Sequence, residues 1–498
     1  MLSALKAPAT MSTQHPDNVQ IPFFSEEAVL GAESEIKEAF YAYSHLGCQE
    51  QMWDFEGKET DSHVVAKLLN RYGEYFKTLP LGRDYRLTFR LPNPAVEPTQ
   101  GKVLLEALES IPRHYDVARA MGIEVAPIFE IILPMTTNAR EVQRISAYYK
   151  KFVVGKAKQM VLEGESTTVA DWLGEFVPSS ISVIPLVEDK DSLLNAGQIA
   201  QELITSEKLG SSEKSSSLRV FLARSDPALN YGSAAAVLYN KIALQRLQEA
   251  SEKTSVPIYP IIGVGSAPFR GNLRPTNTSN CLREYPSVQT FTIQSSFKYD
   301  YAQEKVREAI SEINSHKLGP ALAVDESRAL ALTSILEKEY RAQLIQLQPF
   351  ISALAKHVPS RRARRLHVGL FGYSRSVEGV SMPRAIPFCC ALYSMGIPPE
   401  LLGLSALSDQ QWDDLHELYV KVDEDLSDAL QYANPANFSL AGPYLESRLR
   451  SAYERTGVQS HAAHAAISAQ IKADLVGGKT STLGERILEA AKIRGFLG

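Results

Sequence analysis

Seven short stretches of the chain are almost wholly apolar and rich in β-branched residues, and each is closed by polar or turn-forming residues. They cover residues 85–94, 125–137, 180–188, 218–226, 256–265, 288–296 and 366–374. An apolar run of this length is typical of a strand covered on both faces, as in a parallel sheet wrapped by helices. Residues 180–188 show the pattern most clearly, because the run stops abruptly at a carboxylate, Glu188.

Amphipathic helical patterns separate most of these strands. The clearest cover residues 26–47, 62–77, 103–121, 191–208, 233–253 and 301–315. Steady alternation of strand and helix indicates βαβ units and a parallel sheet. Seven strands exceed a mononucleotide-binding half-fold, and a (β/α)8 TIM-type barrel needs only one more. That eighth strand is expected near His15 or as a split segment within 121–132, while residues 51–58 are interpreted as an aromatic, hydrogen-bonded loop.

The C-terminal part of the chain has no strand pattern. From Pro387 onward the sequence is mostly helical in period. We therefore expect one catalytic domain over residues 1–498, an α/β barrel with additional, mostly C-terminal helices. Its barrel core with inserted helices should span about residues 10–386, and a helical layer packed on it about residues 387–498.

Composition excludes several classes of function. The chain has 498 residues, 44% of them hydrophobic, and a net charge of -5. This balance carries no electrostatic signal for nucleic acid or an anionic membrane, and no segment approaches the ~18 apolar residues of a membrane span. The four cysteines are too few and too irregular for a disulfide framework or a zinc site. The expected compartment is the cytoplasm, with buried reduced thiols at Cys389 and Cys390.

Charged side chains follow the predicted strands, where a barrel gathers its chemistry on one face. The carboxylates are Glu188 and Asp226, and the cations are Arg90, Arg270, Arg375, Arg384 and Lys298. Two carboxylates suit Mg²⁺, which completes its octahedron with water and substrate oxygens. Arginines bind phosphate and carboxylate groups bidentately. The residues therefore predict a metal-assisted enzyme acting on a small phosphorylated carboxylic acid.

Each of these features has a plainer explanation. Glu188 and Asp226 could equally cap the helices that follow them, and the glycine pair at 263 and 265 is weak evidence for phosphate binding. The basic run 356–365 is interpreted as a solvated connection. His461 and His464 are interpreted as neighbours on a helix face. Capping explains one acid, but it does not explain the same placement recurring together with arginines.

Several motifs together resemble phosphoenolpyruvate carboxylase of the short, archaeal type. They are Ser12-Thr-Gln-His-Pro-Asp-Asn18, Arg90-Leu-Pro-Asn-Pro94, Phe269-Arg-Gly-Asn272, Gln294-Ser-Ser-Phe-Lys-Tyr-Asp300 and Arg384-Ala-Ile-Pro387. Pro185-Leu-Val-Glu188 and Ser225-Asp226 are similar to the metal motifs of the longer carboxylases. Their Phe-His-Gly-Arg-Gly-Gly loop has no clean counterpart, so its arginine corresponds here to Arg270 or to Arg274.

The resemblance implies a barrel enzyme, Mg²⁺ or Mn²⁺, a homotetramer, and conversion of phosphoenolpyruvate and bicarbonate to oxaloacetate and phosphate. Carboxyphosphate, CO₂ and a metal-stabilised enolate would be the intermediates. The implied metal ligands are Glu188 and Asp226; the implied catalytic residues are His15, Arg90, Arg270, Arg375 and Arg384; the implied substrate-binding residues are Gly271, Lys298 and Arg274. The resemblance also changes the interpretation of His15, which by itself indicates only a peripheral N-terminal turn. It becomes the expected base that helps carboxyphosphate release CO₂.

Two other hypotheses use the same residues. A phosphotransferase similar to pyruvate kinase would need a nucleotide site, yet the chain has no Gly-x-x-x-x-Gly-Lys-Ser/Thr loop. A non-catalytic barrel that binds a phosphorylated metabolite would use the arginines, but it would need neither the carboxylate pair nor His15.

Overall fold

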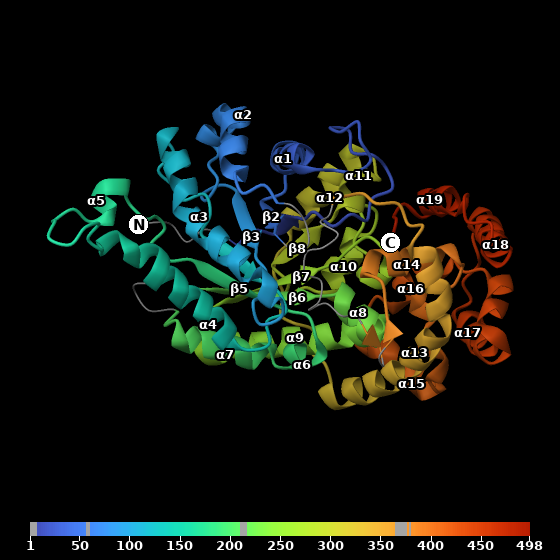
Figure 1. The fold of residues 1–498 in the computed structure, drawn as a ribbon. Helices are drawn as coiled ribbons and strands as arrows, with labels where there is room; N and C mark the ends of the chain where they lie inside the picture. The colour runs from blue at the N-terminus through green and yellow to red at the C-terminus, as the bar shows by residue number, and fades with distance from the viewer. Residues whose placement is uncertain (1–6, 56–59, 210–216, 364–375, 378–379) are drawn as a thin grey trace.

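A closed barrel of eight parallel strands forms the centre of the molecule (Figure 1). The computed structural model describes residues 7–55, 60–209, 217–363, 376–377 and 380–498. The strands are β1 (Thr10–Ser12), β2 (Glu50–Asp54), β3 (Arg86–Arg90), β4 (Glu130–Leu133), β5 (Ser182–Val187), β6 (Leu218–Ala223), β7 (Ile258–Gly263) and β8 (Thr290–Ile293). They follow one another in chain order, and β1 closes the ring by pairing with both β2 and β8. The predicted (β/α)8 fold is confirmed.

Six of the seven predicted strands lie in this barrel. The seventh, 366–374, falls outside the described residues, and the eight strands that close the ring all precede it. The expected strand near His15 is β1. The interpretation of residues 51–58 as a loop was wrong, because Glu50–Asp54 forms β2. This strand begins and ends with a charged residue, so it lacks the continuous apolar pattern of the others. Charged residues are tolerated inside a barrel when they are paired.

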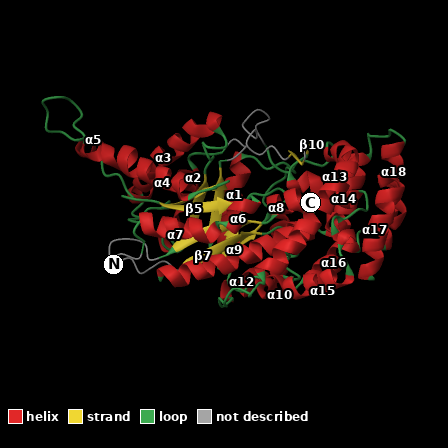
Figure 2. Ribbon diagram, turned by 90° about the horizontal axis from the view of Figure 1, so that it is seen from below, coloured by secondary structure: helices red, strands yellow, loops and turns green. Residues whose placement is uncertain are grey.

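Helices surround the barrel between consecutive strands (Figure 2). They are α1 (Ala32–Tyr41), α2 (Val64–Thr78), α3 (Gly101–Ala120), α4 (Ala139–Tyr148), α6 (Lys190–Leu194), α7 (Ala196–Ser206), α8 (Ser225–Tyr231), α9 (Ser233–Thr254), α10 (Thr278–Glu284), α11 (Ser295–Tyr299) and α12 (Gln303–Ser315). Between α4 and β5 lie the short turns η3 (Tyr149–Val153) and η4 (Val154–Lys158) and the helix α5 (Val169–Leu173). The predicted helices therefore match the observed ring.

The barrel interior is filled in layers, because inward side chains recur every second residue along a strand. At the amino-terminal end of the strands, Arg219 pairs with Glu50 and Glu130, and Glu130 also pairs with Arg86. We call these four residues the floor cluster; all are buried. Above it lies an apolar layer contributed by Met11, Met52, Ile132, Ile184, Leu186, Phe221, Ala223 and Ile261. The floor cluster and the apolar layer thus fill the barrel interior below the carboxyl ends of the strands.

A second body of helices packs against one side of the barrel. It comprises α13 (Glu326–Ala355), α14 (Ala385–Ser394), α15 (Asp409–Leu418), α16 (Val422–Leu430), α17 (Gly442–Thr456), α18 (Ala462–Val476) and α19 (Leu483–Arg494), with a short hairpin of β9 (Ser376–Val377) and β10 (Val380–Ser381). The helix α13 packs on α9 and α14. The predicted boundary near residue 386 lies among these helices.

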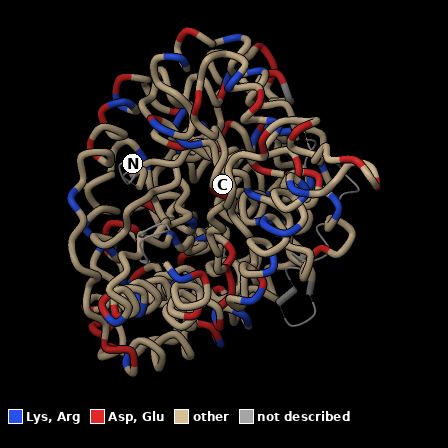
Figure 3. The backbone as a smooth tube through the Cα atoms, turned by 90° about the vertical axis from the view of Figure 1, so that its left-hand side faces the viewer, with Lys and Arg blue, Asp and Glu red and all other residues tan. Residues whose placement is uncertain are grey.

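The four cysteines are free and buried, which confirms the buried thiols predicted at Cys389 and Cys390. Over the described part of the chain, no single helix is long and apolar enough to cross a membrane. The segments Ala385–Ser394 and Pro399–Ala406 reach that length and apolarity only when taken together, and they are bent by 92° relative to each other. On the face shown in Figure 3, acidic and basic residues are interspersed.

Candidate active site

A cavity of about 310 Å³ opens at the carboxyl end of the barrel. Seven strands deliver a lining residue at or just beyond their ends: His15 after β1, Asp54 on β2, Arg90 on β3, Glu188 after β5, Asp226 after β6, Gly263 on β7 and Gln294 after β8. Leu186, Phe221 and Ala223 of the apolar layer line it as well. The cavity thus has an apolar base and a charged wall, as a site for a small anion requires.

Glu188 and Asp226 follow two adjacent, directly paired strands, β5 and β6. The residue that caps α6 is Asp189, whose side chain accepts from the Ser192 amide at 2.9 Å. The residue at the N-cap of α8 is Arg224, and Asp226 is the second residue of the helix, in its first turn. Neither Glu188 nor Asp226 therefore occupies the N-cap position of the helix that follows it.

The same two acids fit a divalent cation. Within the described ranges, no group of three or more His, Cys, Asp or Glu side chains is placed to hold a metal. Two carboxylates in one cavity are nevertheless the donor set that Mg²⁺ uses when water and substrate oxygens supply the remaining ligands. Glu188 and Asp226 are the residues that would hold such an ion.

His15 lies in the turn directly after β1. The Thr13 hydroxyl and His15 Nδ1 share a hydrogen bond of 2.8 Å. Burial, followed by the charges of Arg90 and Arg270, holds the pKa of His15 well below its ordinary value, and Asp54 opposes this only in part. The imidazole is therefore neutral near pH 7. A neutral ring among arginines is able to accept a proton.

Arg270 reaches the cavity from the loop that joins β7 to α10. Its guanidinium donates to Asp17 Oδ2 at 3.2 Å, Ser225 Oγ at 3.2 Å, the Gly498 carbonyl at 2.8 Å and Gln294 Oε1. The loop turns at Gly271, where φ is +119° and a Cβ atom would approach Val264 Cγ1 to 2.5 Å. Gly271 therefore shapes the loop and does not line the cavity.

Arg274 takes a different place in the same loop. It pairs with Asp428 on α16, outside the cavity lining. Asn272 Nδ2 donates to Asp425 and Asp428 on that helix, at 2.8 Å each. Of the two candidate arginines, Arg270 is the one that faces the cavity, and Arg274 joins the loop to the C-terminal helices.

Arg90 and Arg384 complete the cationic wall predicted from the sequence. Arg90 contacts Asp54 through two hydrogen bonds, 3.0 Å from Nε and 2.7 Å from Nη2. Arg384 lines the cavity at the N-cap of α14. Arg375 lies outside the described residues.

Lys298 is placed behind the cavity, fully buried. Its Nζ donates to Ser12 Oγ at 3.0 Å, the Thr13 carbonyl at 2.9 Å and Glu38 Oε1 at 2.8 Å. Burial is the main cause that lowers the pKa of Lys298, against the raising effect of Glu38. The structure thus uses Lys298 to brace the end of β1, next to His15.

Several lining residues escaped the sequence analysis. Asp54 was not assigned to the site, because residues 51–58 were interpreted as a loop. Arg361 and Arg362 belong to the basic run interpreted as solvated, but they are only 6% and 3% exposed. Arg362 pairs with Glu35 and Glu38, and Arg361 donates to the carbonyls of Asn18 and Val19. Residues 358–362 of the run thus line the cavity, and the guanidinium groups of Arg361 and Arg362 point into the protein instead of into solvent.

The two other histidines that the sequence singled out have a structural role. His461 is the N-cap of α18 and accepts from the His464 amide. His464 is buried against Arg494, at 3.0 Å from its Nη1. Burial lowers the pKa of His464 to about 2. The two histidines are thus neighbours at the start of α18, in contact with each other and with Arg494.

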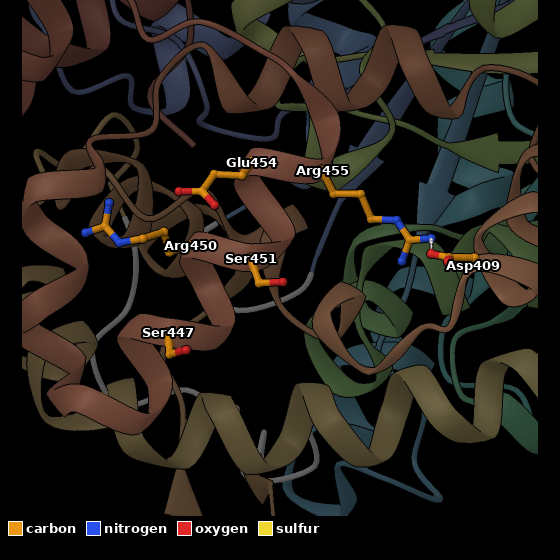
Figure 4. Close-up of a pocket in the computed structure, with 6 residues that line it drawn as sticks. All are labelled: Asp409, Ser447, Arg450, Ser451, Glu454 and Arg455. Atoms are coloured by element: carbon orange, nitrogen blue, oxygen red, sulfur yellow. Dashed lines mark hydrogen bonds and ion pairs between the residues drawn. The ribbon is translucent and has the colours of Figure 1, made fainter.

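A second hollow, of about 490 Å³, lies on α15 and α17 (Figure 4). Its lining is Asp409, Ser447, Arg450, Ser451, Glu454 and Arg455. Arg455 pairs with Asp409 at 2.7 Å, and Arg450 pairs with Glu446 at 2.9 Å. Its arginines are thus engaged within the C-terminal helices, and none of the barrel strands contributes to it.

Comparison with known proteins places the whole chain in one group. The family model described as phosphoenolpyruvate carboxylase matches residues 7–498. A phosphoenolpyruvate carboxylase of Methanothermobacter thermautotrophicus is 48% identical over 99% of this chain and 100% of its own length. That of Methanospirillum hungatei is 50% identical over 99% and 100%. Among solved structures, a malate synthase of Haloferax volcanii aligns with a TM-score of 0.37 and 11% identity over 65% of this chain and 75% of that chain, too low a likeness to carry any argument.

Proposed function

Because this chain belongs to the phosphoenolpyruvate carboxylase family, we propose that its barrel cavity joins phosphoenolpyruvate and bicarbonate to give oxaloacetate and phosphate. The observation that carries the site assignment is the gathering of Glu188, Asp226, His15, Arg90 and Arg270 around one cavity. These residues lie far apart in the sequence, and the barrel alone brings them together. Both substrates are small anions, which suits the charged wall.

Binding rests on the arginines. Arg270 and Arg384 hold the phosphoryl group, together with Arg375, to which the family resemblance assigns the same task. Arg90, fixed by Asp54, holds the carboxylate end and the transferred group. Guanidinium groups preorganised in a largely buried cavity stabilise charge that develops in the transition state, without reorganisation at the moment of reaction.

The proposed reaction has two stages. A bicarbonate oxygen attacks phosphorus, the bond from phosphorus to the enol oxygen breaks, and carboxyphosphate and the enolate of pyruvate result. His15 then accepts the carboxyl proton of carboxyphosphate, which releases CO₂ and phosphate, and the enolate carbon attacks CO₂ to form oxaloacetate. A neutral His15 is in the correct protonation state for this step, and the buried surroundings protect the enolate from water.

A divalent cation, Mg²⁺ or Mn²⁺, is proposed at Glu188 and Asp226. When bound, it supplies a Lewis acid that offsets negative charge on substrate oxygens. Glu188, just after β5, and Asp226, in the first turn of α8, would hold this ion. We further propose that the active form is a homotetramer in the cytoplasm, as the resemblance implies.

One assay tests the activity. Oxaloacetate formed from phosphoenolpyruvate is followed by coupled reduction to malate, with bicarbonate, Mg²⁺ and ADP each added or omitted. The proposal expects turnover that needs bicarbonate and the cation and is indifferent to ADP. Turnover without bicarbonate, or an absolute need for ADP, would contradict it and favour a phosphotransferase. Binding of phosphoenolpyruvate without turnover would favour a non-catalytic barrel.

A further inference from the structure

The chain leaves the barrel between β4 and β5 and forms a projection, which we call the arm. It comprises residues 149–176, with η3, η4 and α5, and is closed on itself by an antiparallel bridge between Met160 and Thr168. Figures 1 and 2 show α5 and its loop extending from the end of the molecule opposite α17 and α18. From Val154 to Ser180, all of them described, no residue is buried. The arm therefore has almost no core of its own.

The arm presents large apolar side chains to solvent. Of the twelve large hydrophobic residues exposed in the described chain, five belong to it: Phe152, Met160, Leu162, Trp172 and Leu173. Trp172 is 65% exposed. Tryptophan is among the residues that contribute most to the energy of protein interfaces, and several large exposed apolar side chains on one short segment are typical of a contact surface.

The charges of the arm are divided into two halves. Residues 150–158 contain four lysines and no acid, and residues 159–176 contain four acids and no base. Lys150 and Lys156 pair with Glu207 and Glu109 on the body of the molecule. Lys151 and Lys158 in the basic half, and Glu163 and Glu165 in the acidic half, make no ion pair with any described residue and are exposed.

A surface divided in this way is complementary to itself. A twofold axis brings the same patch of two subunits together. If residue i of one copy contacts residue j of the other, then residue j of the first copy also contacts residue i of the second. Two arms placed antiparallel would set the basic half of each against the acidic half of the other. The apolar residues would lie between the two arms, and their removal from water would stabilise the pair by about 25 cal/mol for each Å² of apolar surface buried.

We infer that the arm is a contact surface for a second copy of this chain, with two arms paired about a twofold axis through opposite charge halves and Trp172 at the centre. This assignment is independent of the catalytic proposal, because no cavity residue belongs to the arm. A membrane surface fits less well, since Trp172 and Leu173 are flanked by Asp171 and Glu175, which anionic lipids repel.

Charge reversal tests the pairing. One variant carries Lys151→Glu and Lys158→Glu, and another carries Glu163→Lys and Glu165→Lys. Each should halve the mass of the assembly measured by sedimentation velocity, in multiples of the 55.0 kDa chain. Mixing the two variants should restore the wild-type mass, because the opposed halves are again complementary. A matched control, Glu249→Lys with Lys253→Glu on the exposed side of α9, should leave the mass unchanged.

Circular dichroism confirms that each variant is folded, which is expected because the substituted side chains are exposed. Trp172→Asp provides a second disruption that does not depend on the ion pairs, and it should also halve the mass. Three results would overturn the inference: a wild-type chain that sediments as a monomer, arm variants with the wild-type mass, or a mixture that does not reassemble. A membrane role would appear instead as binding of the monomer to anionic vesicles.

Discussion

Exchanging Arg270 and Arg274 for lysine, one at a time, separates the two arginines that the loop motif leaves as alternatives. They stand four residues apart, carry the same charge and are both largely buried. Arg270 contacts four acceptors through three different nitrogens. A lysine ammonium is a single point charge on a flexible stem, so Arg270→Lys keeps the charge but cannot span these acceptors.

We expect Arg270→Lys to lower kcat by about 10²-fold to 10³-fold, or about 2.7–4 kcal/mol, the cost of losing one preorganised donor to developing charge. Arg274→Lys retains an ion pair with Asp428, whose side chain is 27% exposed. It should therefore cost about 1 kcal/mol of stability or less and leave kcat unchanged.

The measurement is steady-state oxaloacetate formation over a range of phosphoenolpyruvate concentrations, with circular dichroism as the check on folding. A folded Arg274→Lys enzyme that loses activity as severely as expected for Arg270 would refute the assignment. So would an Arg270→Lys enzyme with kcat close to that of the wild type.

Four further outcomes follow from the same structure. Glu188→Gln should lower oxaloacetate formation by about 10³-fold and weaken Mn²⁺ binding in calorimetry; full activity would exclude it as a ligand. His15→Asn should raise the ratio of pyruvate to oxaloacetate, and an unchanged ratio would argue against its role as base. Burial raises the pKa of Glu400 to about 8, so between about pH 4.5 and pH 8 the folded chain keeps a proton that the unfolded chain loses, and the free energy of unfolding falls as the pH rises. Glu400→Gln lacks this titration, so its free energy of unfolding should rise relative to that of the wild type by up to about 1.4 kcal/mol per pH unit. Urea midpoints of both proteins at pH 5 and pH 8 measure the difference, and an equal shift in both would contradict it. Arg219→Met leaves the two floor-cluster acids with Arg86 as their cation, so the free energy of unfolding, measured with denaturant, should fall by about 3–5 kcal/mol while kcat changes little. A loss below about 1 kcal/mol would mean that the cluster is hydrated.

The sequence predicted the strands that are apolar throughout, because burial on both faces leaves a continuous signal. It failed at β2, where Glu50 and Asp54 face the barrel interior and are balanced by Arg219 and Arg90. Those partners lie 169 and 36 residues away. Pairing at such separations leaves no local pattern to detect.

The site residues also divide into those that a local sequence pattern indicates and those whose position depends on distant partners. Residues at strand ends, such as Glu188 and Arg90, were predicted because the barrel fixes where a strand end lies. Arg361 and Arg362 were not, because a run of arginines indicates solvent until a fold supplies buried acids such as Glu38. The places of Lys298 and Arg274 also depend on tertiary partners, Glu38 and Asp428, which no motif specifies.

The turn that carries His15 is closed from both directions of the chain. Its strand, β1, pairs with β8, and the Asp17 carbonyl accepts from the Leu497 amide at 2.8 Å. During translation, β1 leaves the ribosome long before either partner exists, and contacts this distant in sequence form slowly. A nascent chain therefore holds the histidine turn without these two supports until both β8 and the segment around Leu497 have been synthesised. Proteolytic cleavage just before Gly495 should therefore lower the activity without unfolding the barrel, because it frees the Leu497 contact with the histidine turn.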